Sequence, residues 1–296
     1  MSSARNARYS APSVTDRLTD WAFRAIVAAT RPLPYERRIP TFGWIISRVV
    51  APVLGYPRRI RRNLALVCPD LTEVEVEHLV RAVPDNVGRS IAEIYSGREF
   101  LERVRDLELE GEGAEVLQRA HVENSPVILA AGHFGNYDAW RGALTERGYR
   151  VGAIYRPMDN TLFNSHYLKA ISTIAEPLFA RDRELRQMLR FLQGGGMVAF
   201  GFDQYFSKGA RLTFFGRKAR TPTSAAELAL RFGVDLVPIY AIRQPDGLSF
   251  RILVEAPVPP SDPETMTQQL NDALEAQVRA HMDQWFWVHQ RWKKSD

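Results

Sequence analysis

The first third of the chain carries the pattern of consecutive helices. Apolar residues in the range 18–29 recur at the three- and four-residue spacing of one helix face. Thr72 is followed three residues later by Glu75, as in a capping box, and the pattern predicts that a further helix opens at Pro84. We therefore expect residues 15–105 to be helical throughout.

One segment within this region, residues 41–56, is apolar but interrupted by Arg48 and Pro52. A membrane-spanning helix needs about 20 uninterrupted apolar residues, so this segment is short for a span, although it could enter one leaflet. A Trp21-bearing amphipathic helix, a short apolar segment and then the basic run Arg58–Arg62 is the order expected of an interfacial anchor on anionic lipid. The alternative is a core helix pair with an exposed basic end.

After residue 106 the pattern changes to alternating strands and helices. Apolar runs that each follow a helical stretch and a turn lie at Val127–Ala131, Val151–Tyr155, Met197–Phe202 and Leu236–Ile242. Such alternation predicts an α/β fold with a mixed, largely parallel central sheet flanked by helices. We expect residues 1–105 to form a helical, membrane-associating N-terminal region. Residues 106–296 would form the α/β core with a C-terminal helix, the two together being one structural unit.

Composition excludes several classes of protein. The chain has 296 residues, 45% of them hydrophobic and 25% charged, with a single cysteine and six histidines. One cysteine excludes a disulfide framework, and the absence of a His-Glu-x-x-His motif leaves no metal site or cofactor to expect. A net charge of +5 does not suggest nucleic acid, but positive residues cluster at Arg58–Arg62 and Lys208–Arg220. Without an apolar leader, the cytoplasmic side is the expected location.

The end of the first predicted core strand carries the candidate chemistry. His133 lies between Gly132 and Gly135, and Asp138 follows five residues later, just after an expected helix start near Asn136. Ligands of parallel sheets bind beyond the carboxyl ends of strands. A carboxylate that reaches one ring nitrogen would leave the other free to take a proton, as a general base does. The alternative is a buried, hydrogen-bonded structural histidine.

No protein nucleophile accompanies this base. The chain has no Gly-x-Ser-x-Gly elbow and no phosphate-binding loop, and Cys68 stands at a helix end elsewhere. We therefore expect His133 to activate a hydroxyl group of a bound substrate, so that a group passes directly between two substrates. Main-chain amides near Gly135 and Asn136 would stabilise the oxyanion.

At this point the residues resemble a known family. The stretch from His133 to Asp138 resembles the H-x-x-x-x-D/E signature of the lysophospholipid acyltransferase superfamily, and within it the chain resembles the bacterial late acyltransferases of lipid A biosynthesis. The resemblance runs from about Trp21 to Lys293, and its further blocks are Tyr155–Pro157, Gly201–Tyr205, Phe214–Gly216, Val237–Ile239 and Gln284–Lys293.

The resemblance implies a role for each matching residue. His133 would be the general base and Asp138 its orienter. Arg156 and Asp203 would organise the site, with Arg156 on a phosphate or on the thioester end of the donor, or simply paired with Asp203. Asn136 and Lys208 would contact substrate.

It also implies the substrates. The donor would be a fatty acyl thioester on acyl carrier protein or coenzyme A, and the acceptor a hydroxyl of a lipid A precursor. The basic clusters would meet an acidic carrier, anionic headgroups or both. The expected location is the cytoplasmic face of the bacterial inner membrane, peripheral or monotopic. Alternatives are another lysolipid acceptor (a lyso-ornithine lipid or a phosphoinositol mannoside), a thioesterase, and a non-catalytic lipid-binding protein. The sequence departs from the family in lacking a clear N-terminal span and a second acid in the third block.

Overall fold

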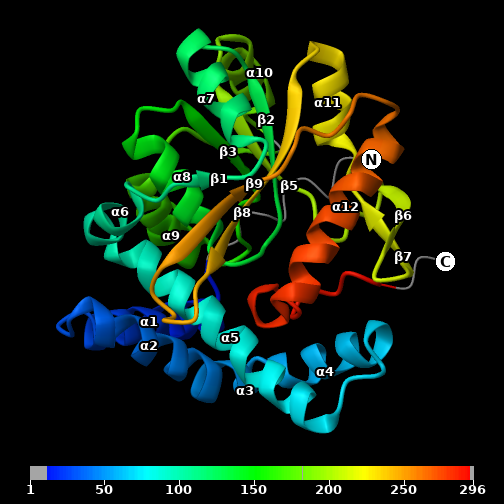
Figure 1. Cartoon of the computed structure of the whole chain (residues 1–296). Coiled ribbons are helices and arrows are strands. Elements are labelled where there is room, and N and C mark those ends of the chain that lie inside the picture. The colour runs from blue at the N-terminus through cyan, green and yellow to red at the C-terminus, as the bar shows by residue number, and fades with distance from the viewer. Residues whose placement is uncertain (1–11, 182, 294–296) are drawn as a thin grey trace.

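The computed structural model describes residues 12–181 and 183–293. Its centre is a seven-stranded sheet with the strand order β1-β9-β8-β2-β5-β3-β4, and a separate hairpin pairs β6 with β7. The helices of the first hundred residues form a layer along one end of this sheet, opposite α7 and α10 (Figure 1). The predicted mixed, largely parallel sheet flanked by helices is confirmed.

The N-terminal layer contains helices only. They are α1 (Val14–Thr30), α2 (Tyr35–Ile45), the π-helical turn η2 (Ile46–Val50), α3 (Ala51–Val53), α4 (Tyr56–Val67), α5 (Glu73–Ser96) and α6 (Arg98–Val104). Within the described residues no single helix is both long and apolar enough to cross a bilayer. Residues 35–53 and 56–67 meet that test only as a pair, across a bend of 86°.

One helix boundary was predicted wrongly. Pro84 does not open a new helix but lies buried inside the continuous helix α5. Proline removes one hydrogen bond from a helix interior, which packing of the surrounding turns can offset. Here α5 packs closely on α2, since a Cβ added to Gly88 would lie 2.9 Å from the Gly43 Cα. The capping box of Thr72 and Glu75 is present as predicted.

The strands of the main sheet are β1 (Leu109–Glu110), β2 (Val127–Ala131), β3 (Val151–Tyr155), β4 (Leu178–Ala180), β5 (Met197–Gly201), β8 (Asp235–Arg243) and β9 (Phe250–Val254). The four predicted strands are confirmed as β2, β3, β5 and β8. Strand β2 pairs in parallel with β5, so that Ala131 stands beside Gly201, and with β8 on its other side. Among the described strands of this sheet, the antiparallel pair is β8 and β9, and β1 pairs in parallel with β9.

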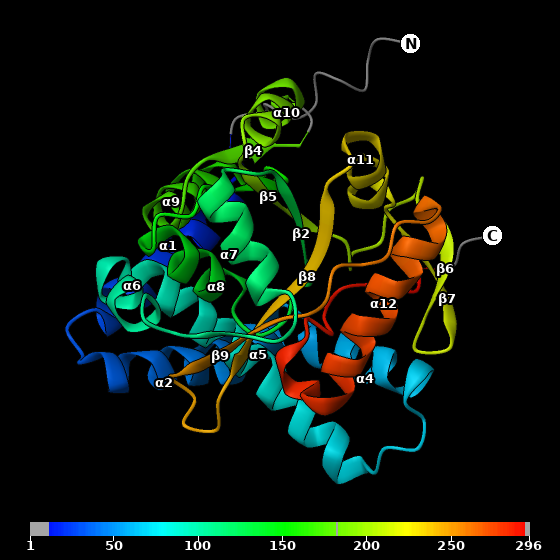
Figure 2. The same cartoon turned by 45° about the horizontal axis from the view of Figure 1, so that its top comes forward.

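Both faces of the sheet are covered, as its continuous apolar strands require. Ile128 and Ala130 of β2 face a core formed with α10 (Leu185–Gln193), α11 (Ser224–Phe232) and α12 (Pro263–Ala280). Val127 and Leu129 face the opposite core, formed with α6, α7 (Ala114–Glu123), α8 (Tyr137–Glu146) and α9 (Thr161–Ile174). Figure 2 shows α11 and α12 on one side of the sheet and α7 and α8 on the other. The hairpin of β6 (Ala210–Phe214) and β7 (Arg217–Thr221) lies beside α12. The turn η3 (Met282–Gln284) follows α12 in the chain.

The carboxyl ends of the central strands face the N-terminal layer. Asn136, just after β2, donates a hydrogen bond from its side chain to Glu93 of α5 at 2.7 Å. Arg243, at the end of β8, forms a buried ion pair with the same Glu93. The edge of the sheet where ligands of parallel sheets bind therefore lies against the helical layer.

Candidate active site

His133 stands at the carboxyl end of β2 on a tight loop. Gly135 has a φ of +58°, and a Cβ there would lie 1.8 Å from the Ala241 carbonyl oxygen, so only glycine fits. Asn136 then caps α8, its side chain accepting a hydrogen bond from the Asp138 amide at 3.0 Å. The helix start predicted near Asn136 is confirmed.

The carboxylate on the imidazole is that of Asp203, which follows β5. Its Oδ1 lies 2.7 Å from the His133 Nδ1, and its Oδ2 accepts from the His133 amide at 2.8 Å. The side chain of His133 is 35% exposed, whereas that of Asp203 is 2% exposed. The expected hydrogen bond between His133 and Asp138 is therefore corrected. Asp203 holds the ring because the loops after the paired strands β2 and β5 are adjacent.

Asp138 is instead paired with its own helix. Its carboxylate forms a fully buried ion pair with Arg141, which also donates to the Ala175 carbonyl at 3.1 Å. Residues three apart share one helix face, so this pair forms inside α8. Burial raises the pKa of Asp138 against the opposing effect of Arg141. The pair ties α8 to the segment after α9.

The charges and burial of His133 and Asp203 suit a general base and the carboxylate that orients it. Burial opposes a charge on His133, but the Asp203 carboxylate outweighs it and raises the pKa of His133 above 6.5. Burial would raise the pKa of Asp203, yet His133 and its hydrogen bonds hold that pKa well below its usual range. An ionised Asp203 accepts the proton of Nδ1, so neutral His133 presents an unprotonated Nε2. The Nε2 lies 3.1 Å from the side-chain nitrogen of Gln204.

The C-terminal block supports this pair. Trp285 donates from its indole nitrogen to the Asp203 Oδ2 at 2.9 Å. The main chain of Phe286 donates to the His133 carbonyl at 3.1 Å. His289 accepts the Tyr205 amide at 2.8 Å, and burial lowers the pKa of His289 to about 4, which keeps it a neutral acceptor.

The amides expected to stabilise an oxyanion are already used. The Gly135 amide donates to the Gln284 carbonyl at 2.9 Å, and the Asn136 amide donates to the Ala241 carbonyl at 3.3 Å. The Asn136 side chain is fully buried between Glu93 and the Asp138 amide. The oxyanion role predicted for both amides is therefore corrected, because in the sharp turn they donate to the main-chain carbonyls of Gln284 and Ala241. Asn136 holds the loop from inside instead of facing substrate.

The two remaining predicted residues lie on neighbouring loops. Arg156 follows β3, has a side chain that is 61% exposed and pairs with Asp159 at 3.5 Å. The expected Arg156–Asp203 pair is not formed, since the donors of His133 and Trp285 occupy the buried Asp203 carboxylate. Lys208 is exposed in the turn before β6. No described cluster of three or more His, Cys, Asp or Glu residues could hold a metal ion.

Sequence reasoning missed the parts of the site contributed by Gln204 and Trp285. Both lie in blocks that carry the family resemblance, so the signal was present without an assigned role. It also missed Gly201, which is exposed next to the ring, and a Cβ there would lie 3.5 Å from the His133 Cε1, an ordinary contact. Gly201 therefore places no side chain over this edge of the imidazole.

Comparison with known proteins places this geometry in a family. The chain is 26% identical over 243 residues to the lipid A biosynthesis lauroyltransferase of Escherichia coli K12, covering 79% of this chain and 78% of that protein. It is 25% identical over 290 residues to the phosphatidylinositol mannoside acyltransferase of Mycobacterium tuberculosis H37Rv, covering 95% and 90%. The lipid A biosynthesis acyltransferase of Haemophilus influenzae is 24% identical over 289 residues, covering 92% and 90%. The family model described as bacterial lipid A biosynthesis acyltransferase matches residues 8–294, and the chain therefore belongs to this family of acyltransferases.

Proposed function

We propose that this protein is a membrane-associated O-acyltransferase. It transfers a fatty acyl chain from a thioester of acyl carrier protein or coenzyme A to a hydroxyl group of a lipid acceptor of the lipid A precursor type. The observation that carries the proposal is the His133–Asp203 pair, whose Nε2 lies 3.1 Å from the Gln204 side-chain nitrogen and, among the described residues, is hydrogen-bonded to no serine, threonine or cysteine. A base of this kind serves a hydroxyl that arrives with a substrate.

The reaction follows from the two ends of the imidazole. The acceptor hydroxyl gives its proton to the His133 Nε2 while its oxygen bonds to the thioester carbonyl carbon, and the carbonyl electron pair moves onto oxygen. Asp203 stabilises the imidazolium that forms. When the tetrahedral intermediate collapses, the carbon–sulfur bond breaks and the thiolate takes the proton from Nε2. The products are an ester and a thiol, without an acyl-enzyme.

The lipid acceptor is suggested by two groups of relatives. Relatives named for lipid A and for phosphatidylinositol mannoside acylation match this chain at similar identity. A glycolipid hydroxyl is common to both, and a lipid A precursor is our first candidate. A mannosylated phosphoinositide or a lyso-ornithine lipid is the alternative acceptor. A non-catalytic lipid-binding protein would not need the buried carboxylate that orients His133.

The N-terminal layer supports membrane association. Val14, Leu18 and Trp21 recur along α1 at the spacing of one face and are 74%, 62% and 71% exposed. Trp44 on α2 is 57% exposed, and the basic run Arg58–Arg62 lies on α4. Exposed apolar helix positions and arginines in one helical layer are typical of binding to an anionic leaflet. We infer that the protein lies on the cytoplasmic face of the bacterial inner membrane.

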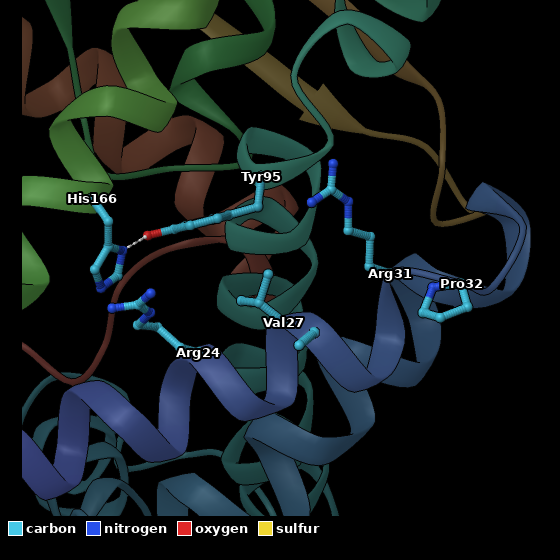
Figure 3. A pocket seen from close by; sticks show the side chains of 7 residues that line it. Arg24, Val27, Arg31, Pro32, Tyr95 and His166 are labelled. Carbon is cyan, nitrogen blue, oxygen red and sulfur yellow. Dashed lines mark hydrogen bonds between the residues drawn. The ribbon is translucent and has the colours of Figure 1, made fainter.

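A pocket of about 510 Å³ opens along the same helix (Figure 3). Arg24 of α1 and Arg31, the residue that follows this helix, lie at its rim, with Val27 between them. At its far side His166 of α9 contacts the Tyr95 hydroxyl at 2.5 Å and the Asp20 carboxylate at 2.8 Å. These contacts hold α1 against α5 and α9, which keeps its apolar face turned outward.

The test is a transfer assay with purified protein in mixed micelles. Acyl carrier protein and coenzyme A thioesters are each offered with a lipid A precursor, a mannosylated phosphoinositide or a lyso-ornithine lipid, and mass spectrometry identifies the product. We expect one acceptor to gain one acyl chain, and His133→Ala to abolish the gain. Release of free fatty acid alone would indicate a thioesterase, and binding of lipid without turnover would indicate the non-catalytic alternative. Donor incubated without acceptor should leave no acyl adduct on the protein.

A further inference from the structure

The side-chain amide of Gln204 occupies the position that the acceptor hydroxyl must take. Its nitrogen lies 3.1 Å from the His133 Nε2, the atom that receives the proton in the proposed reaction. Asp203 holds the proton of the ring on Nδ1, so Nε2 is an acceptor and the Gln204 amide donates to it. An incoming hydroxyl also donates to Nε2 and displaces this amide. The displaced N–H group then remains beside the reacting atoms without its partner.

Four main-chain amides around the imidazole already donate to other acceptors. The His133 amide donates to Asp203, and the Gly135 and Asn136 amides donate to main-chain carbonyls. The Tyr205 amide donates to the His289 ring. Each of these bonds would have to break before the amide could serve an oxyanion. Gln204 alone among these donors loses its partner as a direct result of substrate binding.

From this geometry we propose that Gln204 is a catalytic residue that donates a hydrogen bond to the thioester carbonyl oxygen as it becomes an oxyanion. The inference rests on the proposed acyl transfer. As the acceptor oxygen attacks, its proton passes to Nε2 and the carbonyl electron pair moves onto oxygen, where the Gln204 N–H donates to it. When the carbon–sulfur bond breaks, the carbonyl reforms and the thiolate takes the proton from Nε2. The Gln204 amide then returns to the unprotonated ring.

The size of the effect follows from the nature of the bond. A donor that strengthens its hydrogen bond only in the transition state raises kcat without tightening ground-state binding. Removing one such donor costs about 10²–10³-fold in kcat. We therefore expect Gln204→Met, which keeps the length of the side chain but has no donor, to lower kcat by about 10²–10³-fold with the KM for donor and acceptor little changed. Gln204→Glu, with a carboxylate facing the oxyanion, should be at least as slow.

The pH profile separates this role from a structural one. If Gln204 tuned the imidazole during the reaction, Gln204→Met would move the pH at which kcat falls on the acid side. An oxyanion donor predicts that kcat falls at every pH while the acid limb of kcat stays where it is, because the bound acceptor hydroxyl has already replaced the Gln204 amide at Nε2 and Asp203 still sets the protonation of His133. Gln187→Met, an exposed glutamine on α10, is the matched control and should behave as wild type. Thermal unfolding of each variant shows whether it is folded.

A second measurement does not depend on turnover. Nitrogen NMR of histidine-labelled wild-type protein should show neutral His133 protonated on Nδ1 and unprotonated on Nε2. The opposite tautomer would overturn the proposal, as would a loss in kcat below tenfold or a shifted acid limb in folded Gln204→Met protein.

The same variants distinguish failure of this proposal from failure of the proposed function. If wild-type protein transfers no chain but hydrolyses the thioester, O-acyl transfer is refuted. Because hydrolysis passes through the same oxyanion, Gln204→Met must then lower the hydrolysis rate about 10²–10³-fold for this inference to stand. If neither reaction occurs, both are refuted.

Discussion

Replacing Asp203 with asparagine should reverse the chemistry of His133 while leaving the shape of the site. The Asp203 Oδ2 accepts two hydrogen bonds, from the His133 amide and the Trp285 indole, whereas Oδ1 accepts only the one from Nδ1. An asparagine has one carbonyl oxygen and one NH2 group. Two donors outweigh one, so the oxygen will occupy the Oδ2 position and the NH2 group will face Nδ1. The ring must then accept at Nδ1 and carry its proton on Nε2, where a base is needed.

The magnitude follows from that wrong tautomer. Loss of tautomer control by a buried orienting carboxylate costs about 10⁴-fold in kcat, equivalent to about 5.5 kcal/mol at 1.36 kcal/mol per factor of ten. The free energy of unfolding should fall by only about 1.5–3 kcal/mol, the contribution of one hydrogen bond to a charged group. The assay is kcat at saturating donor and acceptor, with thermal unfolding alongside and nitrogen NMR to read the tautomer. Measured on the plateau where kcat no longer rises with pH, it avoids the titration of His133.

The pH dependence has a definite sign. His133 must be neutral to act, and Asp203 raises its pKa above 6.5, so wild-type activity should fall as the pH drops through a value above 6.5. Without the carboxylate only burial acts, and the residual activity of Asp203→Asn should fall at a lower pH. Stability responds in the opposite sense: the contribution of charged His133 is fully present below about pH 6.5 and is lost as the pH rises through its folded pKa.

Asp138→Asn is the matched control, because it makes the same change in a second buried aspartate, which lies five residues after His133. It leaves Arg141 buried without its counter-ion, which should cost about 3–5 kcal/mol of folding free energy, while kcat per folded molecule should fall less than tenfold. The reasoning would be refuted if Asp203→Asn kept kcat within tenfold of wild type, or if Asp138→Asn lost activity as severely at an unchanged melting temperature.

Three further predictions follow. His133→Ala should lower kcat by at least about 10²–10⁴-fold with little change in melting temperature, because a general base is lost from a partly exposed position; full activity would contradict the mechanism. Gly201→Ala should be near wild type, since its Cβ would make an ordinary contact with the imidazole, whereas Gly201→Leu should block approach of the thioester and lower kcat/KM in a steady-state assay. Reversing the charges of Arg58, Arg59 and Arg62 should weaken sedimentation with anionic vesicles by about 1 kcal/mol per charge, and binding should fall with added salt.

The structure sharpens the design of the vesicle experiment. Arg61 lies in the same basic run but forms an ion pair with Glu77 of α5, so reversing it would disturb the fold. It is therefore left unchanged. Reversal of the exposed Arg186 and Arg190 on α10, at the opposite end of the molecule, is the control and should leave vesicle binding unchanged (Figure 1). Protein that stays in the membrane pellet after both charge reversal and high salt would indicate an integral anchor.

The sequence predicted the elements whose burial imposes a pattern. Strands β2, β3, β5 and β8 are continuous apolar runs because both of their faces are covered, and such runs are visible in one sequence. Strand β9 was missed because it alternates between buried and partly exposed positions near the edge of the sheet. Strands β1 and β4 are too short to carry a period. The helix start predicted at Pro84 was wrong, because the packing of α5 on α2 outweighs the tendency of proline to interrupt a helix.

The part of the site that was predictable is the part set by residues close together in the sequence. His133 was found from its place at a strand end between glycines. Its partner was assigned to Asp138 because five residues of separation are visible in a sequence, whereas the adjacency of β2 and β5 is not. The register that sets Ala131 beside Gly201 brings Asp203 to the ring across 70 residues of chain. The amides of Gly135 and Asn136 were misjudged for the same reason, since the carbonyls that they meet belong to distant segments.

Trp285 tests whether the C-terminal block orients the base or only packs beside it. Its indole nitrogen donates to the buried Asp203 Oδ2, and its ring packs edge-on against Phe214 and Trp287. Trp285→Phe keeps an aromatic ring but removes the donor, leaving Oδ2 with the His133 amide alone. The unfolding free energy should fall by about 1.5–3 kcal/mol for a hydrogen bond to a charged group, in addition to the lost packing. The His133 Nδ1 still meets Oδ1, so the tautomer should be kept and kcat should fall far less than in Asp203→Asn. If the nitrogen NMR spectrum of folded Trp285→Phe instead showed His133 protonated on Nε2, the indole would help to set the tautomer of the base. It would do so through Asp203, which is 82 residues away in the chain.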